Sequence, residues 1–223
     1  MSSPAQSPSE VLTRRVANFA PLWEIAIAYG LIEGALWTLG SARYWWSLAA
    51  MVWIVGITIY RRPTLQGLGI WLGSFHKGLW IAGIAVLFAG VCLSLAGWAG
   101  TLHDYSPDGS LAVRALGYFV WSFEQEFILQ SFIFLRLELL VGSSRAVMLA
   151  AILFAIAHVP SPVLTCGSLV MAWMFCEAFR RYRNIYPLAL AHWMIGLSLS
   201  LALPDFVARH MRVGLGYLRF VAR

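Results

Sequence analysis

LWIAGIAVLFAGVCLSLAGWAG, residues 79–100, contains no charged side chain. An apolar run of about 18 residues or more is long enough to cross the hydrocarbon core of a bilayer as a helix. Comparable runs fill most of the chain, at residues 16–39, 45–60, 112–140, 145–159, 163–180 and 185–203. Because open strand edges cannot face lipid, the sequence predicts an all-α fold, a polytopic membrane helix bundle with about seven or eight transmembrane helices.

The composition supports a membrane protein. Hydrophobic residues make up 60% of the 223 residues and charged residues only 12%, whereas soluble domains carry about 25% charged residues. The net charge of +6 does not indicate nucleic-acid binding, since the basic residues form short clusters between apolar runs rather than one basic face. The cysteines, Cys92, Cys166 and Cys176, lie in apolar segments without close spacing and are expected to be buried hydrophobic side chains.

The chain divides into one transmembrane domain and two tails. Residues 1–15 are rich in Ser and Pro and are expected to be a disordered N-terminal tail, and residues 16–205 form the transmembrane helical domain. Arginines at the start of the first run place the N-terminus in the cytoplasm under the positive-inside rule. The basic tail 206–223 then falls on the opposite side, so it either dips into the membrane or indicates a miscounted span. The Gly-rich segment 61–78 is expected at the membrane interface.

Ionisable side chains inside the predicted spans are the main clue to function, because each costs at least about 2.5–3.5 kcal/mol at mid-bilayer. These side chains are Glu24, Glu33, Glu124, Glu126, His158 and His192. For the two acids of the first run, hydrogen bonding to a neighbouring helix is the favoured role. Glu138 and Glu177 lie near basic ends and are expected to pair with Arg136, Arg180 or Arg181.

Glu126, His158 and His192 belong to three separate runs in the second half of the chain and can converge at one depth of a bundle. Gln130 follows Glu126 at i+4 on the same helix face, and Phe154 precedes His158 at i−4. In one chemistry, the carboxylate and a histidine activate water while the other histidine stabilises an oxyanion, which is peptide hydrolysis. In the other, the three side chains hold zinc, although their spacing is not that of HExxH.

These segments, in this order, resemble the CPBP family, also called the Abi family, of CAAX prenyl endopeptidases and bacteriocin-processing intramembrane proteases. The family pattern is EExxxR, then FxxxH, then HxxxN or HxxxD, and it falls within residues 111–203. Phe154 and His158 complete FxxxH, and His192 supplies the third histidine. The resemblance implies an intramembrane endopeptidase that cleaves a membrane-bound peptide or protein, here as a divergent member in a bacterial inner (plasma) membrane.

Three positions depart from the family pattern. Residues 125–130 read QEFILQ, so Gln125 replaces the first Glu, thought in the family to activate water, and Gln130 replaces the Arg. Gly196 replaces the Asn or Asp of the third motif.

These departures lead to a specific hypothesis about the base. Glu126 lacks the counter-charge that an arginine would give, and we expect it to act as the base, with His158 beside it and His192 as oxyanion donor. Glu124 lies about 200° around the helix from Glu126 and is expected to face elsewhere.

Two further functions remain open from the sequence. The chain can be an inactive relative that binds or scaffolds membrane peptides, or a proton-coupled transporter that uses Glu24, Glu33 and Glu126. No cofactor is expected for the protease, with zinc bound by Glu126, His158 and His192 as the alternative.

Overall fold

The computed structural model describes residues 8–103 and 110–220, with side chains of the first helix described from Phe19 onward. The described residues are mostly helical and contain no strand. The longer helices are α1 (Pro8–Leu36), α2 (Ala42–Arg61), α3 (Phe75–Ala99), α4 (Leu111–Glu126), α6 (Ser143–Ile156), α7 (Pro162–Tyr182) and α8 (Tyr186–Ala202). The shorter elements are η1 (Leu72–Ser74), η3 (Phe127–Phe134), α5 (Leu135–Val141), α9 (Asp205–Ala208), η4 (Arg209–Met211) and α10 (Gly214–Leu218).

Several helices have the length and composition of membrane spans. In the part of the chain that the structure describes, four segments are long and apolar enough to cross a bilayer, namely Phe19–Leu36, Ala42–Arg61, Leu72–Ala99 and Pro162–Tyr182, and α6 and α8 are shorter apolar helices. Large apolar side chains cover the outside of the bundle: Trp98 is 89% exposed and Leu87 is 68% exposed. An apolar exterior of this extent suits lipid as the surrounding solvent. The protein is therefore an integral membrane helix bundle, as the sequence predicts.

α4, η3 and α5 form one unbroken helix from Leu111 to Val141, and its middle part, η3, is π-helical. The sequence predicts this run at 112–140 as ordinary helix, so the π-helical segment is a new finding. Its side chains from Leu129 to Phe134 are all buried. α4 packs on α8, and α5 packs on α1 and α6. This long helix therefore runs through the core of the bundle.

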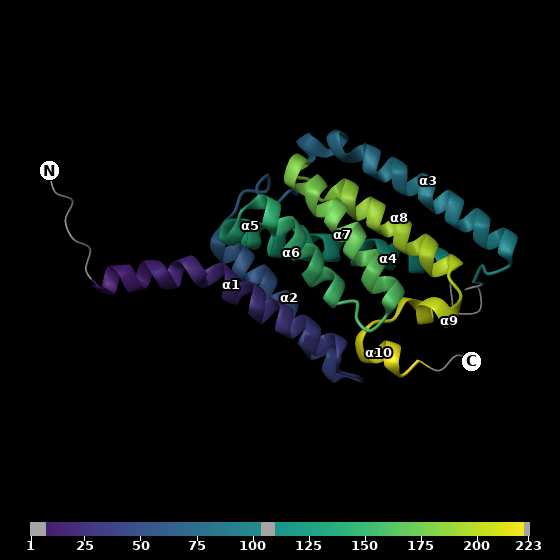
Figure 1. Cartoon of the computed structure of the whole chain (residues 1–223), viewed down its shortest axis with the longest axis horizontal. Helices are drawn as coiled ribbons and strands as arrows, with labels where there is room; N and C mark the ends of the chain where they lie inside the picture. The colour runs from purple at the N-terminus through teal and green to yellow at the C-terminus, as the bar shows by residue number, and fades with distance from the viewer. Residues whose placement is uncertain (1–7, 104–109, 221–223) are drawn as a thin grey trace.

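α3 and α8 lie side by side along most of their length, and α6 pairs with α7 in the same way (Figure 1). Small residues allow the close approach of α3 and α8. A Cβ atom added at Gly78 would come within 2.9 Å of the Pro187 ring, and Ala85 is only 1% exposed. Small residues at contacts are typical of helices that associate in membranes, because van der Waals packing replaces the hydrophobic effect there.

The loop between α2 and α3 is partly folded into the bundle. The Leu68 carbonyl accepts a 2.6 Å hydrogen bond from Ser131 Oγ, and the Gly69 carbonyl accepts one of 2.9 Å from the Ile185 amide. Gly69 has φ +77°, and a Cβ atom there would collide with the Phe179 ring. The expectation that 61–78 lies at the membrane interface stays a prediction, and the structure adds that Leu68 and Gly69 pair with polar groups of the bundle.

Glu24 joins three helices. Its Oε2 accepts a 2.7 Å hydrogen bond from Arg136 Nε on α5, and its Oε1 accepts one of 2.9 Å from Arg61 Nε on α2. The Arg136 guanidinium also lies 3.6 Å from the centre of the Phe132 ring. The helix-joining role predicted for Glu24 is confirmed. Glu33 differs, since its Oε2 accepts a 2.9 Å hydrogen bond from Trp37 Nε1, only one turn later in the sequence.

The expected pairing of the acids near the basic ends is half right. Glu177 accepts hydrogen bonds from Arg180 and Arg181, as predicted. Glu138 pairs with Arg183 at 2.6 Å rather than with Arg136. The reason is geometric: residues two apart on a helix point in directions about 200° apart, so Arg136 faces α1 while Glu138 faces the end of α7.

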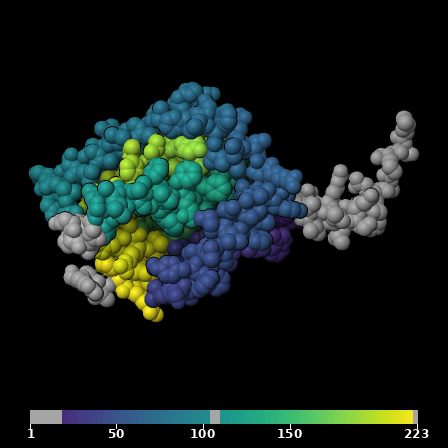
Figure 2. Space-filling view, turned by 180° about the vertical axis from the view of Figure 1, so that it is seen from behind, coloured from purple at the N-terminus to yellow at the C-terminus, as the bar shows by residue number. Residues whose placement is uncertain are grey.

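Both chain ends contain helix, while the division into a domain and two tails stays a prediction. α1 begins at Pro8, inside the segment 1–15 expected to be disordered, since proline at a first helical position is pre-set for helix; residues 1–7 lie outside the described residues. The C-terminal residues form α9, η4 and α10, which fold back on the bundle beside the N-terminal helices (Figure 2). The Gly214 amide donates a 2.8 Å hydrogen bond to the Val159 carbonyl.

Candidate active site

Glu126 is the last residue of α4, at the point where the helix becomes π-helical, and it is fully buried. Its Oε1 lies 2.9 Å from Nδ1 of His192 on α8. Its Oε2 accepts a 3.1 Å hydrogen bond from Gln130 Nε2. The structure thus brings together two of the three predicted site residues, and the Gln that stands at the family's Arg position holds the same carboxylate.

The π-helical segment begins directly after Glu126 and contains Gln130. π-Helical turns are rare and often mark functional sites, because the local widening of the helix changes where side chains point. The local sequence does not predict the transition from α-helix to π-helix, since the segment is uniformly apolar apart from Gln130 and Ser131. Its position supports a functional role for the polar side chains at its start.

His158 follows the end of α6, and its Nδ1 lies 2.7 Å from the Phe154 carbonyl oxygen. A carbonyl only accepts hydrogen bonds, so Nδ1–H donates and the neutral ring keeps an accepting lone pair at Nε2. The Phe154 ring centre lies 4.8 Å from that of His158 and 6.1 Å from that of His192. Phe154 therefore contacts both imidazoles, which gives the FxxxH pattern a physical reason.

Two polar atoms beside Glu126 have unused hydrogen-bonding capacity. Ser122 lies one turn before Glu126 and Gln130 one turn after it, and the Ser122 Oγ and Gln130 Oε1 atoms are buried without a partner among the described residues. Leaving a buried polar atom unpaired costs about 1–3 kcal/mol. Such atoms call for an explanation, and a bound water or ligand group is a common one.

Tyr118 occupies the space next to Gly196, the position of the Asn or Asp in the family pattern. A Cβ atom added at Gly196 would collide with the Tyr118 hydroxyl oxygen. The phenol of α4 therefore fills the volume that a side chain at position 196 would take. Sequence reasoning missed Tyr118, and the signal that could have found it was the missing polar side chain at Gly196.

The remaining predicted residues lie beside this pair. Glu124 and Gln125 are half-buried, whereas Glu126 is completely buried. The carboxylate of Glu126 is held by His192 and Gln130, not by either of these neighbours. Gln125, at the position of the family's first Glu, therefore adds no carboxylate to the site.

The candidate zinc ligands Glu126, His158 and His192 are hydrogen-bonded within the protein. Both carboxylate oxygens of Glu126 already accept hydrogen bonds, and His158 Nδ1 is held by a backbone carbonyl. Within residues 8–103 and 110–220, the metal-ligating atoms that lie within 4.8 Å of one another belong to a different group at the end of α3.

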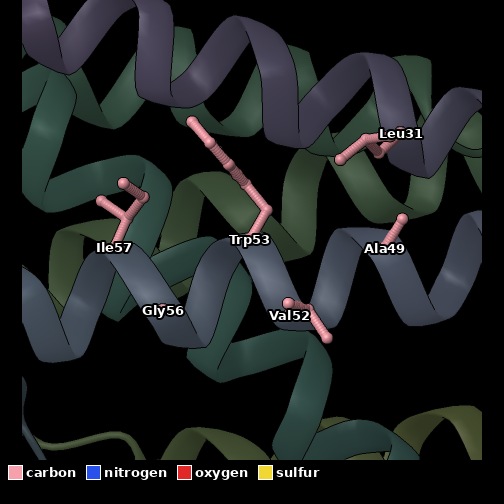
Figure 3. Close-up of a pocket in the computed structure, with 6 residues that line it drawn as sticks. All are labelled: Leu31, Ala49, Val52, Trp53, Gly56 and Ile57. Atoms are coloured by element: carbon pink, nitrogen blue, oxygen red, sulfur yellow. The ribbon is translucent and has the colours of Figure 1, made fainter.

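A shallow apolar hollow of about 430 Å³ lies between α1 and α2 (Figure 3). Its lining consists of Leu31, Ala49, Val52, Trp53, Gly56 and Ile57. None of these is a candidate catalytic side chain, so the hollow is distinct from the Glu126 site. Its lining suits a hydrocarbon chain.

Residues 107–198 match a protein-family model described as Rce1-like, type II CAAX prenyl endopeptidase Rce1-like. The matched range contains Glu126, His158 and His192. No curated protein and no solved structure matches the chain.

Proposed function

Residues 107–198 carry the Rce1-like core of the CPBP family, and on this premise we propose that the protein is an intramembrane endopeptidase that cleaves a membrane-bound peptide or protein. The family is one of CAAX-type intramembrane proteases and implies a membrane-bound protein substrate. The observation that carries the proposal is the buried hydrogen bond of 2.9 Å between Glu126 and His192. A carboxylate and an imidazole are costly to bury among lipid-embedded helices, and ionisable residues at such positions commonly have a functional role.

We assign the base to the Glu126–His192 pair. With the carboxylate ionised, His192 Nδ1–H donates to Glu126, which leaves the lone pair on Nε2 free to accept a proton from water. The carboxylate then stabilises the imidazolium that forms. The sequence alone suggests different roles, with Glu126 as the base and His192 as the oxyanion donor. We assign the base to His192 because its Nδ1 faces the Glu126 carboxylate.

His158 and Tyr118 complete the proposed chemistry. His158 Nε2 accepts a hydrogen bond from the attacking water and orients it, since its Nδ1 is fixed by Phe154. The water oxygen attacks the scissile carbonyl carbon while its proton passes to His192. Tyr118 donates its hydroxyl hydrogen bond to the resulting oxyanion, in the place of the family's Asn or Asp. His192 then returns its proton to the leaving amine as the C–N bond breaks.

A second candidate is a non-catalytic member that binds membrane peptides without cleaving them. The observation that favours it is Gln125, because the amide at the first Glu position cannot take a proton from water. In this case the Glu126–His192 hydrogen bond would only join α4 to α8.

One experiment separates the two candidates. The purified protein is reconstituted in liposomes with membrane-anchored reporter peptides, some carrying a C-terminal prenyl group, and cleavage is measured for wild type, Glu126→Gln and His192→Ala. Glu124→Gln serves as the matched control, since it removes a neighbouring carboxyl outside the pair. Cleavage that is lost in the first two variants and kept in the control supports the protease. Peptide binding without cleavage in all proteins, wild type included, would establish the second candidate instead.

We also propose that the reaction needs no metal and that the N-terminus lies in the cytoplasm of a bacterial cell. The first part is supported by the spacing of the side chains, because the group of metal-ligating atoms within 4.8 Å of one another in the described residues is His103, Asp205 and His210, and not Glu126, His158 and His192. Cleavage that persists after treatment with a chelator would agree with it, and cleavage that requires zinc even in a His210→Ala variant would refute it.

A further inference from the structure

Three metal-ligating side chains meet where the chain leaves α3 and where the C-terminal segment folds back. His103 Nε2 lies 3.1 Å from Asp205 Oδ1, and His210 Nε2 lies 2.9 Å from Asp205 Oδ2. One donor atom from each residue lies within 4.8 Å of the others. We propose that His103, Asp205 and His210 form a binding site for a zinc ion that fastens the C-terminal segment to the end of α3.

The donor set is suited to zinc. Imidazole nitrogens and carboxylate oxygens bind this ion at about 2.0–2.2 Å, commonly as three protein ligands with water in the fourth position. Ligand atoms around a tetrahedral ion at such distances stand roughly 3.4 Å apart. The hydrogen bonds of 3.1 Å and 2.9 Å go to different oxygens of Asp205, and the donor atoms lie within 4.8 Å of one another, so the side chains need to move by about 1 Å to admit the ion. The side chains are 20% exposed at His103 and 37% at His210, so the ion can reach the site.

His103 is held in place by contacts that do not involve the other ligands. Its backbone amide donates a 2.9 Å hydrogen bond to the Leu201 carbonyl. Two residues earlier, Thr101 Oγ1 donates one of 3.0 Å to the Ala202 carbonyl. The loop after α3 is thus fixed to the end of α8, only a few residues before Asp205. This arrangement pre-positions two of the three ligands before any ion binds.

His210 reaches the cluster through a strained piece of backbone. Arg209, His210 and Met211 have φ values of 46°, 53° and 57°, which places three successive non-glycine residues in the left-handed region. Each such residue costs of order 1–3 kcal/mol, and such strain gathers at functional sites. Here the strained turn directs the His210 imidazole at Asp205. Coordination of a metal ion by His210 would offset the conformational strain of this turn.

Zinc bound by His103, Asp205 and His210 would also hold the loop that carries His158 in place. Two residues separate the end of η4 from the start of α10. The Gly214 amide of α10 donates a 2.8 Å hydrogen bond to the carbonyl of Val159, the residue after His158. Holding the C-terminal segment at Asp205 and His210 therefore restrains the loop that carries this histidine. The proposed zinc site does not depend on the protease proposal, since none of its ligands belongs to the Glu126 site.

The test is a zinc titration of the purified full-length protein in detergent, with a fluorescent zinc indicator as competitor. We expect one zinc ion per chain, and a thermal midpoint that rises with zinc concentration because the ion binds the folded state. His103→Ala and His210→Ala should each weaken zinc binding at least about tenfold and abolish the thermal shift. His76→Ala, which removes an exposed histidine at the opposite end of α3, is the control and should bind as wild type does.

A second arm separates this site from the Glu126 site. Glu126→Gln should keep the full zinc affinity; loss of zinc in this variant together with unchanged binding in His210→Ala would overturn the proposal. Equal binding in wild type, His103→Ala and His210→Ala would overturn it as well. If either alanine variant fails to fold, the visible spectrum of the cobalt-substituted wild type decides, since a four-coordinate site with nitrogen and oxygen donors gives intense bands and the absence of bound cobalt refutes the site.

Discussion

Glu126 Oε1 and His192 Nδ1 lie 2.9 Å apart, although the two residues are 66 positions apart in the sequence. Glu126 is fully buried and His192 is 4% exposed. A buried carboxylate and imidazole that face each other satisfy one another's hydrogen-bonding groups, so either one alone would be a costly residue in a membrane bundle. The pair therefore joins α4 to α8 and provides the acid–base couple of the proposed chemistry.

Replacing either member of the pair should abolish cleavage. Glu126→Gln keeps the size of the side chain but cannot stabilise an imidazolium, and His192→Ala removes the proposed base. General acid–base groups contribute about 10²–10⁴-fold, and we expect a decrease in kcat of that size in each variant. The measurement is cleavage of the membrane-anchored reporter in liposomes. A Glu126→Gln protein as active as Glu124→Gln would exclude the assigned pair.

Removing the Tyr118 hydroxyl should lower kcat more than it raises KM. Tyr118→Phe takes away the proposed oxyanion donor while the ring still packs beside Gly196, and the loss of one such donor costs about 10²–10³-fold in kcat. The double variant Tyr118→Ala with Gly196→Asn restores the family pattern, because alanine vacates the space that the asparagine needs. Activity recovered in the double variant relative to Tyr118→Ala would support the replacement. An unchanged kcat in Tyr118→Phe would remove Tyr118 from the mechanism.

The helices could be predicted from the sequence because lipid imposes a simple rule: long apolar runs are helical. The predicted run 112–140 corresponds to the continuous helix from Leu111 to Val141. The π-helical part could not be predicted, since it depends on which backbone hydrogen bonds form within one apolar segment. The number of helices that cross the membrane stays a prediction.

Contacts between side chains were harder to predict than the helices. Glu126, His158 and His192 were recognised from their order along the chain, but their contacts depend on packing. Tyr118 was missed because its hydroxyl approaches Gly196 of α8 from α4, a contact that the spacing along the chain does not record. His210 was missed because it meets His103 only after the C-terminal segment folds back, and no spacing in the sequence records that fold.

Two buried serines on the same long helix should respond differently to alanine. Ser131 Oγ donates a 2.6 Å hydrogen bond to the Leu68 carbonyl, so Ser131→Ala leaves that carbonyl unpaired and should lower the free energy of unfolding by about 1–3 kcal/mol. Ser122 Oγ has no partner among the described residues, so Ser122→Ala should leave stability unchanged or slightly raised. Unfolding in mixed detergent measures both. A lower activity of the stable Ser122→Ala protein would indicate that the hydroxyl binds water or substrate, and equal destabilisation of both variants would contradict the assigned hydrogen bonds.

Removing the Glu24 carboxylate should strongly lower the free energy of unfolding. Arg136 is only 7% exposed, and its partners include Glu24 Oε2 at 2.7 Å. Glu24→Ala leaves that guanidinium without its counter-charge, and breaking a buried pair in this way costs about 3–5 kcal/mol. Glu177→Ala is the matched control, because it removes an acid that also binds two arginines, but on partly exposed side chains of one helix, where a pair contributes about 0–1 kcal/mol. The free energies of unfolding of both variants should differ by several kcal/mol. Similar values would mean that water reaches Arg136, and the ion pair that joins α1, α2 and α5 would then contribute little to the stability of the bundle.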